Sequence, residues 1–238
     1  MGDSATHRGA EYYLDFLSRI IPADFTSHAI LMVVVWFIMV PICVLAIRFG
    51  KPKPTFDGIR VEIRLRNPEW WWFSTHKFGL YFAIGLGVIG ATTALIVSGG
   101  FSGSVHSVFG IATVVLGCAQ IVSSWLRGKH GGRYYHDADP GNPETWHGDH
   151  YDMTPRRRKF EAFHKTCGYF VGFCATGAVA TGLMQYPVPG LPIVVLVAAL
   201  AIFALAVIFE YKGYRHDGYR AAFGFDPEHP YNKARSEL

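Results

Sequence analysis

Five long stretches of this chain contain no Asp, Glu, Lys or Arg. A helix needs about 20 apolar residues to cross the hydrocarbon core of a bilayer, and each stretch has that length or nearly so. Backbone N–H and C=O groups find no water partners in lipid, so such stretches must be helices. The sequence therefore predicts an all-α membrane protein with five transmembrane helices in one domain. The uncharged stretches are residues 29–47, 78–100, 105–126, 166–189 and 191–209.

Polar segments flank the predicted helices. Residues 1–27 hold four acidic residues and lack a basic leader with a short apolar core, so we expect the first helix to be retained as its own insertion signal. Residues 11–21 mix aromatic and charged side chains at roughly helical spacing, which predicts an interfacial helix; docking on a partner is the alternative. The predicted organisation is an N-terminal tail over 1–27, a transmembrane domain over 28–210 and a C-terminal tail over 211–238.

Basic residues are distributed unevenly between the two sides of the predicted membrane domain. Five spans place the termini on opposite sides, and only Arg8 and Arg19 of the 22 Lys and Arg residues fall on the N-terminal side. Cytoplasmic loops carry the Lys/Arg excess. We therefore predict a multi-pass integral membrane protein with an extracytoplasmic N-terminus and a cytoplasmic C-terminus.

Each of the first four predicted spans carries one histidine near its N-terminal end, and the fifth carries none. An ionisable residue within the membrane or at its edge needs a partner and indicates a functional site. Successive helices alternate in direction, so the histidines of the first and third helices lie near the outer face and those of the second and fourth near the cytoplasm. The four residues are His28, His76, His106 and His164.

This alternation predicts two histidine pairs, His28 with His106 and His76 with His164. Two imidazoles that face each other across a helix bundle are the usual axial ligands of a six-coordinate haem. The four cysteines all fall inside spans, and none belongs to a C-x-x-C-H attachment motif. The sequence thus predicts two haems, one towards each membrane face, with the four histidines as iron ligands. The alternative is that they are ordinary interfacial side chains.

Glycines recur on the histidine-bearing helix faces. A porphyrin between helices needs flat backbone beside its ligand, and a residue four positions after a histidine lies on the same helix face. Eleven residues are almost three turns, so a glycine at that offset returns to this face about 16 Å deeper, where it could admit the edge of the other haem. Helix packing is the alternative role. The predicted cofactor contacts are Gly110 and Gly168 at the first offset, and Gly87 and Gly117 at the second.

The second and fourth helices are predicted to begin well before the lipid. Asn67-Pro68 and Thr154-Pro155 each combine an N-cap residue with proline at the first helical position. His76 and His164 follow these caps at nine and ten residues, so we expect similar heights for the two imidazoles.

The sequence resembles the cytochrome b561 and ferric-reductase transmembrane family, particularly the branch often fused to DOMON domains. The resemblance covers roughly residues 26–210. The matching residues are His28-Ala29-Ile30-Leu31-Met32 with Trp36, Pro41 and Arg48; Trp72-Phe73 before His76-Lys77; His106, Gly110, Gly117 and Gln120; and His164, Gly168-Tyr169 and Gly182-Leu183.

The resemblance implies two non-covalent haem b groups in a core of four helices, ligated from alternate helices, with the fifth helix peripheral. No DOMON-like segment occurs here, so we expect the outer electron partner of that branch to be absent or a separate chain. Ascorbate-using relatives place lysines in the turns before the second ligand, where residues 67–72 read Asn-Pro-Glu-Trp-Trp-Trp. That difference weakens the case for ascorbate as the donor.

We expect transmembrane electron transfer from a cytoplasmic donor, through the His76/His164 haem and then the His28/His106 haem, to an outer acceptor; the direction is implied by the resemblance. The chain offers no nucleophile, carboxylate pair or phosphate loop, so the haems would carry the chemistry. Oxidoreductase activity towards ferric chelates, ascorbate or quinol is left open. The alternative is a non-catalytic di-haem anchor or relay subunit of a respiratory or photosynthetic complex.

The expected partners follow from this function. They are the lipid bilayer, a small-molecule or protein electron donor and acceptor, and either other subunits of a membrane complex or a second copy of the chain; no nucleic acid is expected.

One loop is rich in potential metal ligands. Residues 130–152 include His130, His136, His147 and His150, interleaved with aspartates. Nothing in the sequence fixes a tetrahedral arrangement, so a solvated polar loop is the expected structure and a metal site the alternative.

Overall fold

The computed structural model describes residues 10–14, 19–56, 70–128, 137–139, 141–148, 154–229 and 232–233. Within these ranges, five helices are long and apolar enough to cross a membrane, which confirms the predicted all-α membrane architecture. The first span is built from three consecutive segments, α1 (Phe25–Val33), the π-helix η2 (Val34–Met39) and α2 (Val40–Phe49). The other spans are α3 (Trp71–Val97), α4 (Val105–Trp125), α5 (Pro155–Gln185) and α6 (Leu191–Tyr211).

Two helix starts were predicted from N-cap residues. Thr154 caps α5 as predicted, because its side chain accepts a hydrogen bond from the Arg157 N–H and Pro155 occupies the first turn. The first helical residue of α3 is Trp71, and the predicted cap at Asn67 lies outside the described residues. Both helices therefore extend beyond their uncharged stretches, and their histidines lie inside the helix instead of at its first residue.

The predicted interfacial helix over residues 11–21 is not present. The described parts of this segment form two antiparallel strands, β1 (Ala10–Leu14) and β2 (Arg19–Ala23), with Tyr12 opposite Ile21. Adjacent tyrosines and adjacent isoleucines favour a strand over a helix, and Pro22 removes a helical hydrogen bond. The spacing of aromatic and charged residues suggested a helical period, but these local preferences decided the structure.

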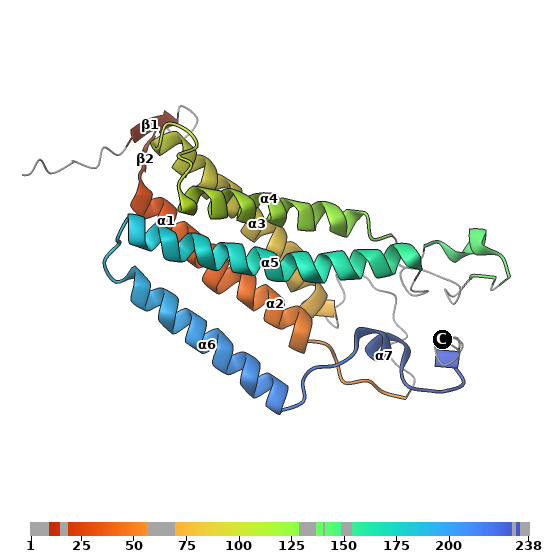
Figure 1. Ribbon diagram of the computed structural model, residues 1–238. Helices are drawn as coiled ribbons and strands as arrows, with labels where there is room; N and C mark the ends of the chain where they lie inside the picture. Colours follow the sequence, from red (N-terminus) through yellow and green to blue (C-terminus); the bar gives the residue numbers. More distant parts are fainter. Residues whose placement is uncertain are drawn as a thin grey trace, which may run out of the picture.

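The first four spans pack into one bundle, and α6 lies to one side of it (Figure 1). The bundle core is a cluster of buried residues from η2, α3 and α5, with Trp36, Ala83 and Val171 among its members. Only 6% of the most apolar window of α6 is buried, against 33% for α5. This helix touches the bundle along α2 and η2, where Phe49 packs on Phe209 at 5.5 Å between ring centroids. The arrangement of four core helices and one peripheral helix is as expected.

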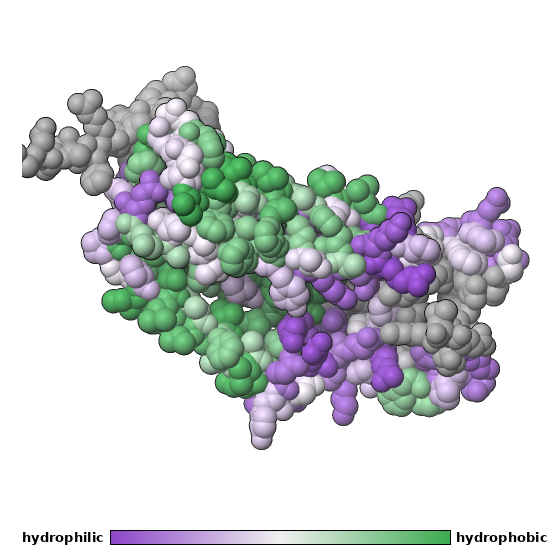
Figure 2. Space-filling view, in the orientation of Figure 1, coloured by the Kyte–Doolittle hydropathy of each residue, from purple (hydrophilic) through white to green (hydrophobic). Residues whose placement is uncertain are grey.

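Apolar side chains cover the outside of the helices, as a lipid-facing surface requires, and hydrophilic residues gather at the end where α3 and α5 begin (Figure 2). Large exposed residues on this surface include Phe82, Val115 and Phe203. Water would make such a surface unfavourable, whereas lipid tails would not. The surface therefore agrees with a multi-pass membrane protein.

Residues 214–229, here named the C-terminal strap, fold back onto this hydrophilic end and contain α7 (Gly218–Phe223). The Tyr219 hydroxyl donates to the Glu161 carboxylate of α5 at 2.7 Å, and Lys51 donates to the carbonyl of His216 at 3.3 Å. Backbone N–H groups of Phe225 and Asp226 both donate to the carbonyl of Phe56. These contacts fix the strap beside the first turns of α5, just before His164.

Candidate functional site

The four helix-entrance histidines form two pairs within the bundle. The ring centroids of His28 and His106 are 6.0 Å apart, and those of His76 and His164 are 6.2 Å apart. Each pair joins helices that run in the same direction, α1 with α4 and α3 with α5. The rings therefore meet in the pairs that helix direction predicts, and within the described residues His28 makes no ring contact with the adjacent-helix His76.

The separation within each pair suits one metal ion between two imidazoles. A metal–nitrogen bond of about 2 Å on each side, with about 1.1 Å from Nε2 to the ring centre, places two ring centroids about 6 Å apart. The interplanar angles are 82° and 73°. Each ligand ring can rotate about its metal–nitrogen bond, so these angles are compatible with coordination.

Backbone carbonyls orient three of the four imidazoles. Nδ1 of His28 lies 2.8 Å from the carbonyl oxygen of Gly90, and Nδ1 of His76 lies 3.3 Å from that of Cys43. A carbonyl oxygen can only accept, so each Nδ1 carries the hydrogen and Nε2 keeps a free electron pair. Metal-binding histidines almost always have such a partner on their second nitrogen.

The same arrangement recurs at His106, whose Nδ1 lies 2.8 Å from the carbonyl oxygen of Ala178. His164 differs from the other three. Its Nδ1 is buried and makes no hydrogen bond with the described residues. Instead its backbone carbonyl accepts a hydrogen bond from Nε2 of Gln120 at 3.0 Å.

The two pairs lie at two levels, and each helix contributes a residue to both. On α3, His76 is at one level and Gly90, 14 residues later, accepts the bond from His28 at the other. The same interval separates His106 from Gln120 and His164 from Ala178. Fourteen residues of α-helix span about 21 Å. The levels are therefore about 21 Å apart along the helix axes.

The first span needs 15 residues to cover the same interval, from His28 to Cys43. The π-helix η2 lies inside this interval. A π-turn closes hydrogen bonds five residues back and so takes up an additional residue within the turn. The extra residue is thereby absorbed, and both His28 and Cys43 face the bundle interior.

Gly110 and Gly168, one turn after His106 and His164, border open space. A methyl group added at Gly110 would meet no atom within 4 Å, and one added at Gly168 would meet only Nε2 of Gln120, at 3.9 Å. Flat backbone thus lies beside a histidine in each pair. Contact of these two glycines with a haem stays a prediction.

Gly87 and Gly117 are buried, but they face Trp36 and not a histidine. A methyl group at either position would lie 3.6 Å from the indole ring of Trp36, and at Gly117 it would also collide with Ile84. Gly87 lies one turn before Gly90 on α3, and Gly117 lies one turn before Gln120 on α4. Their predicted contact with a haem edge stays a prediction, and within the described residues their neighbour is the indole of Trp36.

Gly182 is a site residue that spacing alone does not reveal. A methyl group there would lie 2.8 Å from Cε1 and 2.9 Å from Nδ1 of His106, so only glycine leaves room for this ring. Gly182 follows Ala178 by four residues, and both lie on the face of α5 that meets His106. Gly182-Leu183 is among the residues that carry the family resemblance, and that was the available signal for this part of α5.

Basic side chains surround the His76/His164 pair. Lys51, Arg127, Arg157 and Lys165 lie close enough to act on these imidazoles electrostatically. Arg157 donates from Nε to Glu161 at 3.1 Å and stacks over Phe160, whose ring lies 5.1 Å from that of His164. Burial holds the pKa of Lys51 below its ordinary value. This end of the bundle is therefore suited to negatively charged groups.

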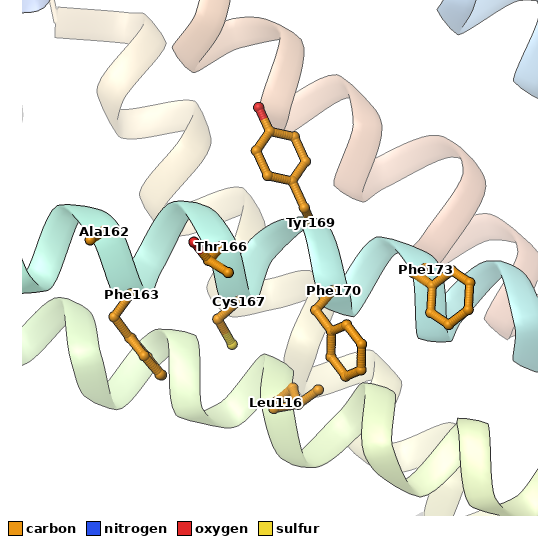
Figure 3. A pocket seen from close by; sticks show the side chains of 8 residues that line it. All are labelled: Leu116, Ala162, Phe163, Thr166, Cys167, Tyr169, Phe170 and Phe173. Atoms are coloured by element: carbon orange, nitrogen blue, oxygen red, sulfur yellow. The ribbon is translucent and has the colours of Figure 1, made fainter.

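An apolar recess lies along α4 and α5 (Figure 3). Phe163, Phe170 and Leu116 face one another across it, whereas Tyr169 points away from α4. None of the four paired histidines lines the recess, so it belongs to the lipid-facing surface. Its lining residues are Leu116, Ala162, Phe163, Thr166, Cys167, Tyr169, Phe170 and Phe173.

The loop between α4 and α5 gives no support to the alternative of a metal site. His147 lies 3.3 Å from the carboxylate of Asp137, while His130, His136 and His150 lie outside the described residues. In the part of the chain that the structure describes, no three His, Cys, Asp or Glu side chains are grouped to hold a metal ion. Each histidine pair therefore offers two protein ligands, and a metal bound there would need its remaining ligands from a cofactor.

Comparisons with known proteins add no relative: no family model, curated protein or solved structure matches this chain.

Proposed function

We propose that this chain carries electrons across a membrane through two non-covalent b-type haems. The observation that carries the proposal is the presence of two histidine pairs, 6.0 and 6.2 Å between ring centroids, at two levels of one bundle. The resemblance to the cytochrome b561 family supports the same function. The proposed iron ligands are His28 with His106, and His76 with His164.

The residues around each pair fit a haem. Each pair would supply two imidazole ligands to iron, and a porphyrin would supply the remaining ligands, which the described residues near the pairs do not offer. Carbonyls of Gly90, Cys43 and Ala178 hold three of the imidazoles in the tautomer that leaves Nε2 for iron. Gly110 and Gly168 leave space beside them. When bound, haem supplies one-electron chemistry at its iron.

The bundle itself sets the distance between the two sites. The hydrocarbon core of a bilayer is about 30 Å thick, and the two ligand pairs are about 21 Å apart along helices that cross it. The chain thus divides a long electron path into shorter intervals. Trp36 and its neighbours fill the interval between the levels with packed apolar side chains and exclude water from it.

Charge supports an orientation with the N-terminus outside and the C-terminus in the cytoplasm. All but two of the Lys and Arg residues fall on the side of the His76/His164 pair, in agreement with the positive-inside rule. We propose that the donor acts at this basic end and the acceptor at the other. Both are small molecules or proteins that the membrane keeps apart.

The test is a reduced-minus-oxidised spectrum and a pyridine haemochrome count on protein purified from haem-supplied cells. We expect two b-type haems per chain. Vesicles holding the purified chain and internal ferricyanide should then bleach when a reductant is added outside, and vesicles with the His28→Ala variant should bleach much more slowly. Purified chain without haem would contradict the proposal, as would equal rates in vesicles with and without protein.

A further inference from the structure

Gln120 occupies the position that backbone carbonyls occupy at the other three histidines. At the level of the His76/His164 pair, α4 contributes Gln120, just as α3 and α5 contribute Gly90 and Ala178 at the other level. The two contributed carbonyls at the far level accept bonds from a histidine Nδ1. The contribution from α4 is a carboxamide.

Two buried polar atoms at this junction lack partners among the described residues, Nδ1 of His164 and Oε1 of Gln120. One is a nitrogen that can carry hydrogen, and the other is an oxygen that can only accept. Leaving either buried without a partner is unfavourable, and native proteins rarely do so. A bond between them would satisfy both atoms at once.

The side chain of Gln120 already lies against the turn that bears His164. Its Nε2 donates to the backbone oxygen of His164 at 3.0 Å, and a methyl group on Gly168, one turn later, would lie 3.9 Å from the same nitrogen. A role in joining α4 to α5 explains the nitrogen of the carboxamide. It does not explain why its oxygen is buried without a partner among the described residues.

We propose that Gln120 is the positioning residue of His164, with Oε1 accepting the hydrogen of Nδ1 after a change in the side-chain torsions of Gln120. Gln120 then binds the backbone and the imidazole of the same residue. This inference rests on the proposed function, because the bond fixes the nitrogen that faces iron. It makes His164 the one ligand of the four whose orienting acceptor is a replaceable side chain.

The consequence is a redox potential that a point substitution can adjust. A hydrogen bond from Nδ1 raises the basicity of the ligand, and second-shell hydrogen bonds are one of the levers on haem potential. Removing the acceptor in Gln120→Met should make the His76/His164 haem easier to reduce. Gln120→Glu, which offers a stronger acceptor when ionised, should make it harder to reduce.

Spectroscopic redox titration tests this in the His28→Ala background, which should retain only the His76/His164 haem. We expect Gln120→Met to change the reduced-to-oxidised ratio at fixed potential by about tenfold, which equals about 59 mV for one electron. Gln120→Glu should move it in the opposite direction. Ser123→Ala is the matched control, because its hydroxyl lies on the same helix and, within the described residues, bonds only to the carbonyl of Gln120.

The outcomes separate this inference from the proposed function. If the His28→Ala parent binds no haem, the proposed function has failed at this site. If the parent binds haem and neither Gln120 variant shifts the titration, Gln120 does not position His164. An equal shift in Ser123→Ala also overturns the inference. Gln120→Glu has nearly the native shape and keeps the test decisive if Gln120→Met fails to fold.

Discussion

Gly182→Ala should selectively weaken binding of the haem that we propose for His28 and His106. The added methyl group would lie 2.8 Å from Cε1 of His106, about 0.6 Å closer than the 3.4 Å at which ordinary contact begins. His106 cannot retreat when Nδ1 is bonded to Ala178 and Nε2 is bonded to iron. One of these two bonds must therefore lengthen or break.

The size of the effect follows from this collision. Overpacking of this kind costs about 1–3 kcal/mol. Because about 1.4 kcal/mol is a factor of ten, haem affinity at this site should fall about 5-fold to 150-fold. In the haem-free protein the imidazole can rotate away at Nε2, so we expect a much smaller effect on its stability.

The assay is haem content per chain together with the difference spectrum, measured at limiting haem. Gly172→Ala is the matched control, because it lies on the same helix and its methyl group would meet no atom within 4 Å. We expect Gly182→Ala to keep one haem and the control to keep two. If Gly182→Ala binds both haems with unchanged affinity, His106 is not held at both ring nitrogens.

Three further predictions concern the pairs and the two ends of the bundle. His28→Ala and His106→Ala should each remove the same haem, and the double variant should lose no further haem. If the His28→Ala, His76→Ala double variant kept a six-coordinate haem, the pairing would be wrong. Burial and the Glu161 carboxylate raise the pKa of Tyr219, so its bond to Glu161 should contribute about 1–3 kcal/mol to the free energy of unfolding below pH 10, the ordinary tyrosine pKa, and less as pH rises further. Tyr219→Phe should lower the thermal midpoint in detergent at pH 7 and make the midpoint less sensitive to alkaline pH. An unchanged midpoint at pH 7 would exclude the bond. Asp24 caps α1 by accepting a hydrogen bond from the Ser27 N–H at 2.6 Å, and this bond lowers the pKa of Asp24. Asp24→Ala should therefore speed amide hydrogen exchange at Ser27 and His28 above pH 4, whereas Asp24→Ser should not. Equal exchange rates in the two variants would refute the cap.

The membrane helices and the pairing could be predicted because both depend on simple physical constraints. Uncharged length decides which segments cross the bilayer, and alternating direction decides which helix entrances share a face. His28 and His106 meet for that reason alone. The haem itself stays a prediction, because neither the distances nor the comparisons test it.

Other features depend on tertiary contacts that the sequence pattern does not reveal. The strands β1 and β2 follow from local preferences that outweighed an apparent helical period. Spacing along the helix does not reveal that the neighbour of Gly87 is the indole of Trp36, which comes from another helix. The C-terminal strap is fixed by bonds between residues far apart in the chain. Tyr219 and Glu161 are 58 residues apart, and Lys51 and His216 are 165 apart, so no local pattern predicts the strap.

The π-turn η2 has a consequence for tracing the ancestry of this bundle. Three of its helices share one 14-residue repeat between levels, and the first helix departs from it by a single inserted residue. An ungapped comparison of this helix with the other three, or with a relative that lacks the insertion, can match His28 or Cys43 but not both. Homology searches of this span should therefore allow one gap between Val34 and Met39, where the backbone has already accommodated the extra residue.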